Sequence, residues 1–266
     1  MRPEIEIMRY SIPCFLLLAG VLFSCNPETR NKTILVVFAH PDDETTIGPV
    51  MNKYSEQNEV YLLLATDGSF GVTEHAGIPA GDSLVEIRKK ETACSCEALG
   101  IHPPVFLDLQ DGLGLNGHGN FYEMEPLLKE RLLEAILEVK PDIIITFGPG
   151  GDTGHPDHRL VGAITTEILL REDLMDEMDL YYFSWTRHQA EKYKMWNLNY
   201  LDEGAMDIRV SYEQKHEDAA IASIRCHRSQ YTEELMDEWI QLELDDPSNI
   251  LYFRSFVQNR KIRDHF

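Results

Sequence analysis

Residues 34–44 read ILVVFAHPDDE, a continuous apolar run that ends in a cluster of imidazole and carboxylate side chains. A short apolar run rich in Val, Leu and Ile is typical of a strand whose two faces are both covered in a parallel sheet. Three later stretches have the same character. The sequence therefore predicts four buried strands, at Ile34–Ala39, Val60–Thr66, Val105–Leu109 and Ile143–Phe147.

Amphipathic stretches alternate with these strands. Helices are predicted at Pro49–Gln57, Ser83–Leu99 and Glu125–Val139. Strands separated by helices indicate βαβ units with right-handed crossovers, and hence a mostly parallel sheet. The expected fold class is α/β, a three-layer sandwich in which helices flank both faces of the sheet.

The pattern is less regular beyond residue 160. A helix is predicted over Leu160–Leu170, a strand over Leu180–Ser184 and a further helix over Tyr212–Cys226, whereas Trp185–Gly204 is predicted to be irregular. No internal repeat and no low-complexity linker interrupts the sequence, so residues 25–266 are expected to form a single domain.

The composition limits the classes of partner. The chain has 266 residues, a formal net charge of −21 and a hydrophobic fraction of 43%, enough for a sizeable core. A surface this acidic repels phosphate backbones, which argues against a nucleic-acid-binding protein. It tolerates neutral or amino-bearing substrates and attracts divalent cations. The alternative is that the charge serves only solubility.

The N-terminal segment has the order of a secretory signal, because Arg9 precedes the 12-residue apolar run Ile12–Phe23 and a small residue follows it. The run is too short to span a bilayer as a helix. Leu22–Cys25 resembles a bacterial lipobox, so residues 1–24 are predicted to be removed and Cys25 to carry lipid. An ordinary cleaved signal and a buried N-terminal helix are the alternatives. We expect an exported lipoprotein, anchored to a membrane on its periplasmic or cell-surface side.

Three cysteines would remain after such processing, Cys94, Cys96 and Cys226. An odd number leaves at least one free thiol. Cys94 and Cys96 are two positions apart on a predicted helix, so their side chains point to different sides and do not clamp a metal together. They are predicted to be packing residues, and no disulfide scaffold is expected.

Polar clusters follow the first and fourth strands, as HPDD at residues 40–43 and HPDH at residues 155–158. Open α/β sheets bind their ligands at the carboxyl ends of the strands. Imidazole nitrogen and carboxylate oxygen are good zinc ligands, and a catalytic zinc ion needs three of them plus an open position for water. We predict that His40, Asp43 and His158 hold one zinc ion.

The remaining groups of the two segments have chemical uses. Asp42 is predicted to act as general base on the metal-bound water, and His155 to stabilise the developing oxyanion. Asp157 is predicted to hold an imidazole in the required tautomer. The alternative is that each His-Pro-Asp segment is only a turn, since Pro and Asp favour turns. Two such segments at strand ends favour the metal site.

The motif AHPDDE at residues 39–44, together with HPDH at residues 155–158, resembles the LmbE-like, or PIG-L, family of N-acetylglucosaminyl deacetylases. The resemblance extends from residue 33 to about residue 230 and includes the HRSQ run at residues 227–230. It implies a Rossmann-like fold, one divalent ion, usually zinc, and hydrolysis of an N-acetyl group from a glucosamine-containing substrate. The roles predicted above for the two segments are the ones that the resemblance implies.

The resemblance also aligns Arg88 and Asp111 with positions that contact the substrate. For Arg88 the alternative is an ion pair with a neighbouring glutamate on the helix surface, and for Asp111 a plain turn aspartate. His227 is expected either near the site or as a cap at the end of a helix. Lys215 is expected to be structural. The glycine-rich loop 113–122 is either a mobile flap over the pocket or a tolerant surface loop.

The leading functional hypothesis is a zinc-dependent deacetylase that acts on a small-molecule or glycan substrate and releases acetate and a free amine. One alternative is hydrolysis of another N-acyl compound, and another is a non-catalytic surface protein that binds glycan or metal. No Gly-x-x-x-x-Gly-Lys segment and no Gly-x-Ser-x-Gly segment occurs. Nucleotide hydrolysis and serine esterase chemistry therefore have little support.

Overall fold

The computed structural model describes residues 31–115, 117–245 and 248–256. The predicted signal segment, residues 1–24, and the predicted lipidation site, Cys25, lie outside these residues, and both stay predictions. Among the described residues, no helix combines the length and the apolar character needed to cross a membrane.

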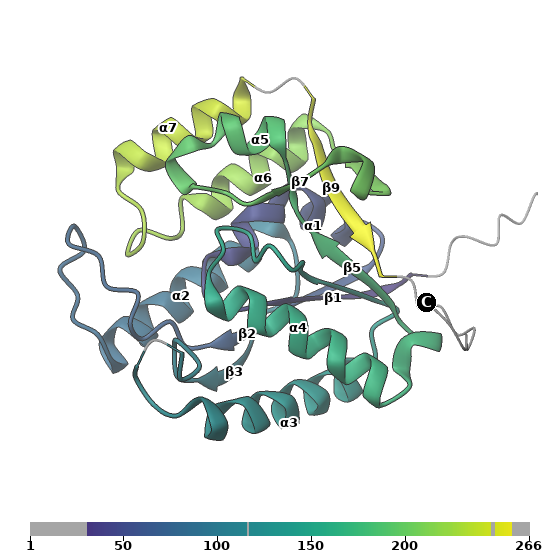
Figure 1. The fold of residues 1–266 in the computed structure, drawn as a ribbon. Coiled ribbons are helices and arrows are strands. Elements are labelled where there is room, and N and C mark those ends of the chain that lie inside the picture. The colour runs from purple at the N-terminus through teal and green to yellow at the C-terminus, as the bar shows by residue number, and fades with distance from the viewer. Residues whose placement is uncertain (1–30, 116, 246–247, 257–266) are drawn as a thin grey trace, which may run out of the picture. The chain divides into compact units, whose positions relative to one another are not determined.

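A seven-stranded sheet forms the centre of the described part of the chain (Figure 1). Its strand order is β3-β2-β1-β4-β5-β9-β8, in which β3 to β5 are parallel and β9 and β8 pair antiparallel. The strands are β1 (Thr33–Phe38), β2 (Glu59–Thr66), β3 (Val105–Leu109), β4 (Ile143–Phe147), β5 (Asp179–Phe183), β8 (Ile208–Ser211) and β9 (Ile250–Ser255). The mostly parallel sheet predicted from the sequence is confirmed.

Helices cover both faces of this sheet. On one face α1, α2 and α6 pack against one another, and on the other α3 packs against α4 (Figure 1). The helices are α1 (Gly48–Ser55), α2 (Asp82–Leu99), α3 (Phe121–Val139), α4 (Pro156–Arg171), α5 (Arg187–Lys192), α6 (Gln214–Ile224) and α7 (Glu233–Leu244). The predicted three-layer α/β architecture is therefore confirmed.

The central strand is β1, between β2 and β4. From Ile34 to Phe38 no residue is more than 3% exposed. Helices cover both faces, so neither face of β1 needs polar side chains, and the run lacks the alternation of a half-exposed strand. At the end of the strand, the ring of Phe38 stacks on Phe147 of β4 with centroids 4.3 Å apart. The core thus extends up to the edge at which the polar clusters begin.

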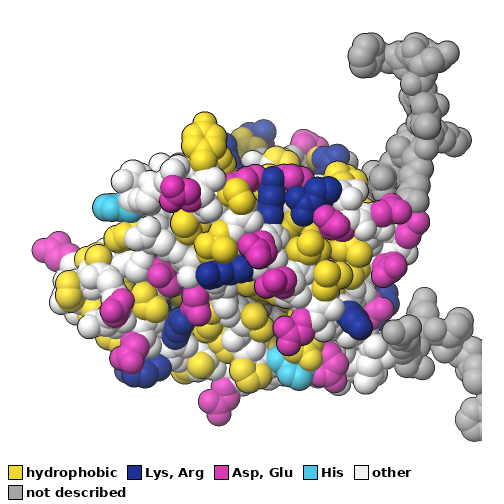
Figure 2. All heavy atoms as spheres, turned by 90° about the horizontal axis from the view of Figure 1, so that it is seen from below, with side chains coloured by type: hydrophobic (Ala, Val, Ile, Leu, Met, Phe, Trp, Pro, Cys, Tyr) yellow, Lys and Arg dark blue, Asp and Glu magenta, His cyan; other side chains and the backbone are white. Residues whose placement is uncertain are grey.

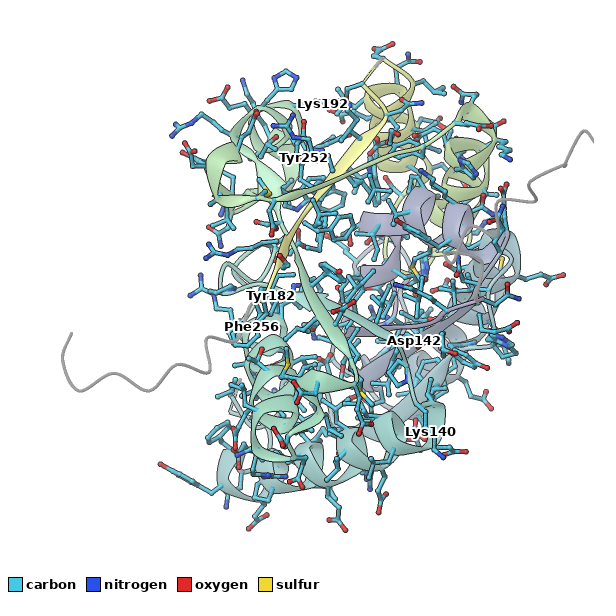
Figure 3. The ribbon with its side chains drawn as sticks, turned by 90° about the vertical axis from the view of Figure 1, so that its right-hand side faces the viewer. Lys140, Asp142, Tyr182, Lys192, Tyr252 and Phe256 are labelled. Atoms are coloured by element: carbon cyan, nitrogen blue, oxygen red, sulfur yellow. A yellow bond between two sulfur atoms is a disulfide. The ribbon has the colours of Figure 1, made fainter. Side chains whose placement is uncertain are left out.

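Two antiparallel strands beyond β5 were not predicted. The helices α6 and α7 separate β8 from β9 in the sequence. The two strands pair without a hairpin turn between them, so the sequence contains no local signal for this pairing. The rings of Tyr182, on β5, and Phe256, just after β9, meet edge to face with centroids 6.2 Å apart (Figure 3). Residues 185–204 form only the short strands β6 (Trp185–Thr186) and β7 (Tyr200–Leu201), α5 and single 3-10 turns, which confirms the irregular segment predicted there.

The prediction for Cys94 was wrong. Cys94 forms a disulfide with Cys226, which lies 132 positions later in the sequence. The packing of α2 against α6 brings the two together, and the sequence spacing carries no sign of that contact. Cys96 is the remaining free thiol among the described residues and is buried in the core, as predicted.

Candidate active site

The two His-Pro-Asp segments meet at the carboxyl ends of β1 and β4. These strands are parallel neighbours, with Val37 opposite Thr146, so the segments that leave them start side by side. A 3-10 turn over Asp43–Ile47 follows β1, and His155 immediately precedes α4. Pro156 occupies the first position of α4, where its missing N–H breaks no helical hydrogen bond. Side chains 118 positions apart in the sequence thereby come into contact.

Three predicted metal ligands converge at this edge. Nδ1 of His40 lies 3.1 Å from Nε2 of His158 and 3.6 Å from Oδ2 of Asp43. Nε2 of His158 lies 3.1 Å from Oδ1 of Asp43. All three residues are at most 8% exposed. The backbone N–H groups of Ala39 and His40 donate to Oδ2 of Asp43 at 3.0 and 2.7 Å and fix its carboxylate.

In each imidazole one nitrogen, the inner one, faces Asp43, and a hydrogen-bond acceptor holds the other, outer nitrogen. Nε2 of His40 lies 3.1 Å from Oδ2 of Asp157 and 3.3 Å from Oδ1 of Asp111. Nδ1 of His158 lies 3.2 Å from the carbonyl oxygen of Gly151. These outer nitrogens therefore carry protons, and in a neutral ring the inner nitrogen presents a lone pair. Two lone pairs and a carboxylate repel one another at these distances unless a proton or a cation lies between them, so the donor set fits a divalent cation.

The electrostatics of the cluster favour such a positive charge. Burial lowers the pKa of His40, but its hydrogen bonds with Asp111, Asp157 and Asp43 outweigh burial and raise that pKa well above its ordinary value. Burial raises the pKa of Asp43, but the charges of His158 and His40 hold it well below its ordinary value. The cluster thus keeps its carboxylate ionised and stabilises a cation or a proton beside it.

Two other groupings of side chains bring ligand atoms within 4.8 Å of one another. One combines His155 with His40 and His158, and the other combines Asp111 and Asp157 with His40. In the first, Nδ1 of His155 already accepts the backbone N–H of Asp157 at 3.2 Å. In the second, both carboxylates face the outer nitrogen of His40, which carries the proton. The grouping predicted from the sequence uses the inner nitrogens and fits best.

Asp42 lines the pocket beside this cluster and has an unusual backbone. Its φ of 103° is in the left-handed region, a conformation that costs a non-glycine residue roughly 1–3 kcal/mol. Arg88 holds it, since Nη2 lies 3.2 Å from Oδ2 of Asp42 and also donates to the carbonyl of Pro41, while Nη1 donates to Gly68 at 3.0 Å. Burial raises the pKa of Asp42 to about 6, although Arg88 lowers it. Asp42 can therefore take up and release a proton near neutral pH.

Arg88 and Asp111 both line the pocket. Arg88 is 3% exposed, so the alternative of a surface ion pair was wrong. Glu91 instead accepts hydrogen bonds from the backbone N and the hydroxyl of Ser229, at 2.7 and 2.6 Å. Asp111 is 7% exposed and accepts the backbone N–H of Phe70 at 3.0 Å, which makes it more than a turn residue. Contact of either residue with substrate stays a prediction.

A second buried pair lies behind Asp42. Nε2 of His227 is 2.7 Å from Oε1 of Glu44, and both side chains are fully buried. Oε2 of Glu44 accepts the backbone N–H of Asp42 at 3.1 Å. His227 therefore lies near the site, one of the two positions expected for it, and Glu44, to which sequence reasoning assigned no role, links it to Asp42. Lys215 pairs with Glu56 at the surface.

A pocket of about 500 Å³ opens over the cluster. One part of its lining consists of the cluster with Asp42, Arg88 and His155. Another part is aromatic. No sequence pattern singled out its individual residues, because three of them lie in the irregular segment 185–204 and Trp239 lies on α7, a helix that was not predicted. The rings in this part belong to Trp185, Tyr193, Trp196, Tyr231 and Trp239.

Part of the glycine-rich loop predicted over residues 113–122 borders the same pocket, whereas its last two residues, Phe121 and Tyr122, begin α3. Leu115 lines the pocket, and the ring of His118 stacks on Phe70 with centroids 4.3 Å apart. Phe70 also lines the pocket. The loop is thus placed where a flap would act, and its movement stays a prediction.

Residues 35–169 match the sequence model of the PIG-L family, which is described as GlcNAc-PI de-N-acetylase. The match includes most of β1, all of β4 and most of α4, and therefore His40, Asp43 and His158. The chain belongs to the PIG-L family. The resemblance seen in its two His-Pro-Asp segments is thereby confirmed.

A curated relative of this PIG-L chain is the 1D-myo-inositol 2-acetamido-2-deoxy-alpha-D-glucopyranoside deacetylase of Kineococcus radiotolerans. The two are 33% identical over 162 residues, which are 52% of this chain and 45% of the relative. The chain spans about half the length of the first curated relatives it matches.

Solved structures share the fold at low sequence identity. The N,N'-diacetylchitobiose deacetylase from Pyrococcus horikoshii has a TM-score of 0.60 and 21% identity, over 87% of this chain and 86% of that one. A 4-carboxy-2-hydroxymuconate hydratase from Pseudomonas putida has a TM-score of 0.61 and 17% identity, over 87% and 99%. The second catalyses a different reaction, so the fold alone does not decide the chemistry of a PIG-L chain. The function has to be argued from the site.

Proposed function

We propose that the chain is a metal-dependent hydrolase that removes the N-acetyl group from an amino sugar of the glucosamine type. The observation that carries this proposal is the convergence of the inner nitrogens of His40 and His158 and the carboxylate of Asp43, beside Asp42, at the floor of a pocket. The family description and the Kineococcus radiotolerans relative support it, since both name deacetylation of an N-acetylated glucosamine compound.

His40, Asp43 and His158 would hold one divalent cation, and zinc suits their nitrogen and oxygen donors. When bound, such an ion supplies a Lewis acid that polarises the amide carbonyl and makes a water molecule more acidic. The chain orients the ligands in advance, because Asp157 and the carbonyl of Gly151 hold the two rings by their outer nitrogens.

Asp42 moves the proton in this proposal. Its Oδ2 accepts a hydrogen bond from Arg88, so Oδ1 is the oxygen that takes a proton from the attacking water. With a pKa of about 6, the carboxyl group can then deliver that proton to the leaving amine. One water molecule is consumed, the amide C–N bond is broken, and the products are acetate and the amine, which carries the second proton of the water as an ammonium group.

His155 would donate a hydrogen bond to the substrate carbonyl oxygen. Its Nδ1 accepts the backbone N–H of Asp157, so the proton of the neutral ring lies on Nε2. Burial and the neighbouring imidazoles His40 and His158 lower the pKa of His155, which keeps the ring neutral. A neutral donor in the pocket wall is suited to the negative charge that develops on the oxygen.

Acetate release from N-acetylglucosamine and N,N'-diacetylchitobiose by the zinc-loaded protein tests the proposal. Asp42→Asn should keep the metal and lose at least about 100-fold in kcat, because general acid–base catalysis contributes roughly that much. Glu86→Gln, which removes one carboxylate from the exposed side of α2, should leave the rate unchanged. Full activity of Asp42→Asn would contradict the proposed mechanism.

Two outcomes would favour the alternative functions. Turnover of other N-acyl amines, with none for amino sugars, would indicate a different amidase. Metal binding without turnover of any N-acyl compound would indicate a binding protein. The presence of Asp42 beside the ligands supports the enzyme, because a protein that only binds metal has no use for a buried base there.

We also propose that the chain is exported and anchored through a lipid on Cys25. The order of charged and apolar residues before Cys25 supports this, and so does the disulfide between Cys94 and Cys226, since disulfides are typical of oxidising compartments. Mass spectrometry of the mature N-terminus tests it. A chain that begins at Cys25 with added lipid mass is expected, and an unprocessed N-terminus would overturn the proposal.

A further inference from the structure

The pocket has an aromatic wall that the proposed reaction does not use. Trp196, Tyr231 and Trp239 form a mutual edge-to-face cluster, with centroids 5.5 to 5.6 Å apart, and Trp185 lies 5.4 Å from Tyr193. All five rings line the pocket that holds the catalytic cluster. The pocket volume of about 500 Å³ falls among sites that enclose ligands larger than one acetylated sugar ring, roughly 300–1,000 Å³.

The charges around this wall are unfavourable to an anionic substrate. Among the described residues that line the pocket, Arg88 is the one lysine or arginine. Its guanidinium donates to two backbone carbonyls and to Asp42, so it is already engaged. Five aspartates share the lining: Asp42, Asp43, Asp111, Asp152 and Asp157. A phosphate in the pocket would meet these carboxylates without a free cationic side chain to pair with, and the divalent ion proposed for this site would offset only part of their charge.

We propose that the aromatic wall binds an uncharged ring joined to the N-acetylated sugar. A phosphate group joined to the sugar at the same position should bind less well than such a ring. The faces of a sugar or an aryl ring present C–H or π surface, which packs on aromatic side chains and needs no counter-charge. This inference rests on the proposed function. It assigns specificity to the wall, and to Trp196 in particular.

Trp196 is the most informative wall residue to replace. It is half-buried on a 3-10 turn, Lys194–Trp196, and its Nε1 has no hydrogen-bond partner among the described residues, so its removal breaks no such bond. Trp185 is less suitable, since its Nε1 donates to Asp152. Tyr122, an aromatic residue of α3 that is 84% exposed and does not line the pocket, provides a matched control.

The test compares acetate release from four compounds: N-acetylglucosamine, its 1-phosphate, its phenyl glycoside and N,N'-diacetylchitobiose. For the phenyl glycoside and the chitobiose, kcat/KM should be roughly tenfold higher than for the free sugar, because one good ring contact contributes about that much. For the 1-phosphate, kcat/KM should be lower than for the free sugar. The phenyl glycoside and the chitobiose separate an aryl from a sugar occupant. Equal kcat/KM for all four would overturn the inference.

The variants assign the effect to the wall. Trp196→Ala should remove the advantage of the extended compounds mainly through KM and leave the free sugar within about twofold, and Trp196→Phe should restore most of it. Tyr122→Ala should change nothing. An equal loss on every compound would mean a structural defect and would overturn the inference. A preference for an N-hexanoyl sugar over an N-acetyl sugar that is lost in Trp196→Ala would show that the wall binds the acyl group, and it would overturn the inference.

Binding separates this inference from the proposed function. In calorimetry with the zinc-loaded Asp42→Asn protein, the phenyl glycoside should bind about tenfold more tightly than N-acetylglucosamine, and Trp196→Ala should abolish the difference. These results would support ring binding by the aromatic wall even if no compound were hydrolysed. In that case only the proposed function would fail. Equal binding of the two compounds would overturn the inference whether or not acetate is released.

Discussion

At the scale of single residues, the site is a set of buried charges that hold one another in place. The inner nitrogens of His40 and His158 face the carboxylate of Asp43 because Asp157 and Gly151 hold the outer nitrogens. These contacts explain why two short segments with little freedom suffice for a metal centre.

The pH dependence of the reaction should follow Asp42, which must be ionised to accept a proton. Burial raises its pKa to about 6, so kcat/KM should fall as the pH falls through that value. A bound cation would lower this pKa, and the midpoint should then lie at or below pH 6. Arg88→Gln removes a charge that lowers the pKa and should move the midpoint upward.

A pH profile of kcat/KM for metal-saturated protein checks this expectation. Lys89→Gln, at the next position on α2 but paired with Asp108, should leave the midpoint unchanged. A midpoint that moves downward in Arg88→Gln would mean that another group controls the acid limb.

The buried pair of His227 and Glu44 should matter for stability. His227→Gln would leave the charge of Glu44 buried without its partner, and breaking such a pair typically costs about 3–5 kcal/mol. His102→Gln, which removes a half-buried imidazole from its surface pair with Glu59, should cost less than about 1 kcal/mol. Urea unfolding of both variants measures the difference. Equal free energies of unfolding would contradict the importance of the buried pair.

Much of this site could be predicted from the sequence. Imidazole and carboxylate residues that follow two strands at fixed spacing predict that His40, Asp43 and His158 lie together, and the structure brings these three proposed ligands into contact. The pair of His227 and Glu44 could not be predicted, because the two residues are 183 positions apart and meet only when α6 has docked. The individual rings of the aromatic wall could not be singled out either, because they come from the irregular segment 185–204 and from residues 231 and 239, which meet only in the folded chain.

At the scale of elements, the parallel part of the sheet was predictable and its antiparallel edge was not. The strands β1 to β4 are continuous apolar runs bounded by turn residues, so their local sequence is sufficient. By contrast, β8 and β9 each form through pairing with a strand far away in the sequence, and no local signal shows that pairing. The helix α7 was missed although Thr232, a good N-cap residue, precedes it and accepts the backbone N–H of Leu235.

Gly162 of α4 packs closely against the end of β4. A Cβ atom there would be 2.2 Å from the carbonyl oxygen of Phe147, at the end of β4. Gly162→Ala should therefore push α4 outward and cost about 2 kcal/mol of stability, and it should weaken zinc binding because α4 carries His158. Ala163→Ser, on the exposed side of the same helix, should do neither.

Thermal unfolding and zinc titration of these two variants check the expectation. Unchanged zinc affinity in Gly162→Ala would show that the position of α4 does not set the geometry of the metal site.

At the scale of the whole molecule, the acidic balance of the chain distinguishes its surface from that of a phosphate-binding protein. Figure 2 shows one face, on which Asp and Glu side chains are interspersed with Lys, Arg and hydrophobic side chains and no broad basic area is visible. With a net charge of −21, the field of the chain repels polyanions and concentrates cations. This agrees with a site that gathers a divalent ion and a neutral sugar.

The disulfide joins α2, which carries Arg88, to the turn after α6, which carries His227. Replacing both Cys94 and Cys226 by Ser should lower the free energy of unfolding by about 2–4 kcal/mol, as is typical for a cross-link over a long stretch of chain. Urea unfolding of this variant against the oxidised wild type measures the loss. The same stability in both would mean that the packing of α2 against α6 suffices without the bond.

The metal content of the purified protein tests the central claim most directly. After exposure to zinc and removal of the free ion, elemental analysis should find about one zinc ion per chain in the wild type and in His102→Ala, whose half-buried imidazole pairs with Glu59 and does not line the pocket. His40→Ala, Asp43→Ala and His158→Ala should each hold almost none while remaining folded. Retention of one full equivalent in all three variants would contradict the account.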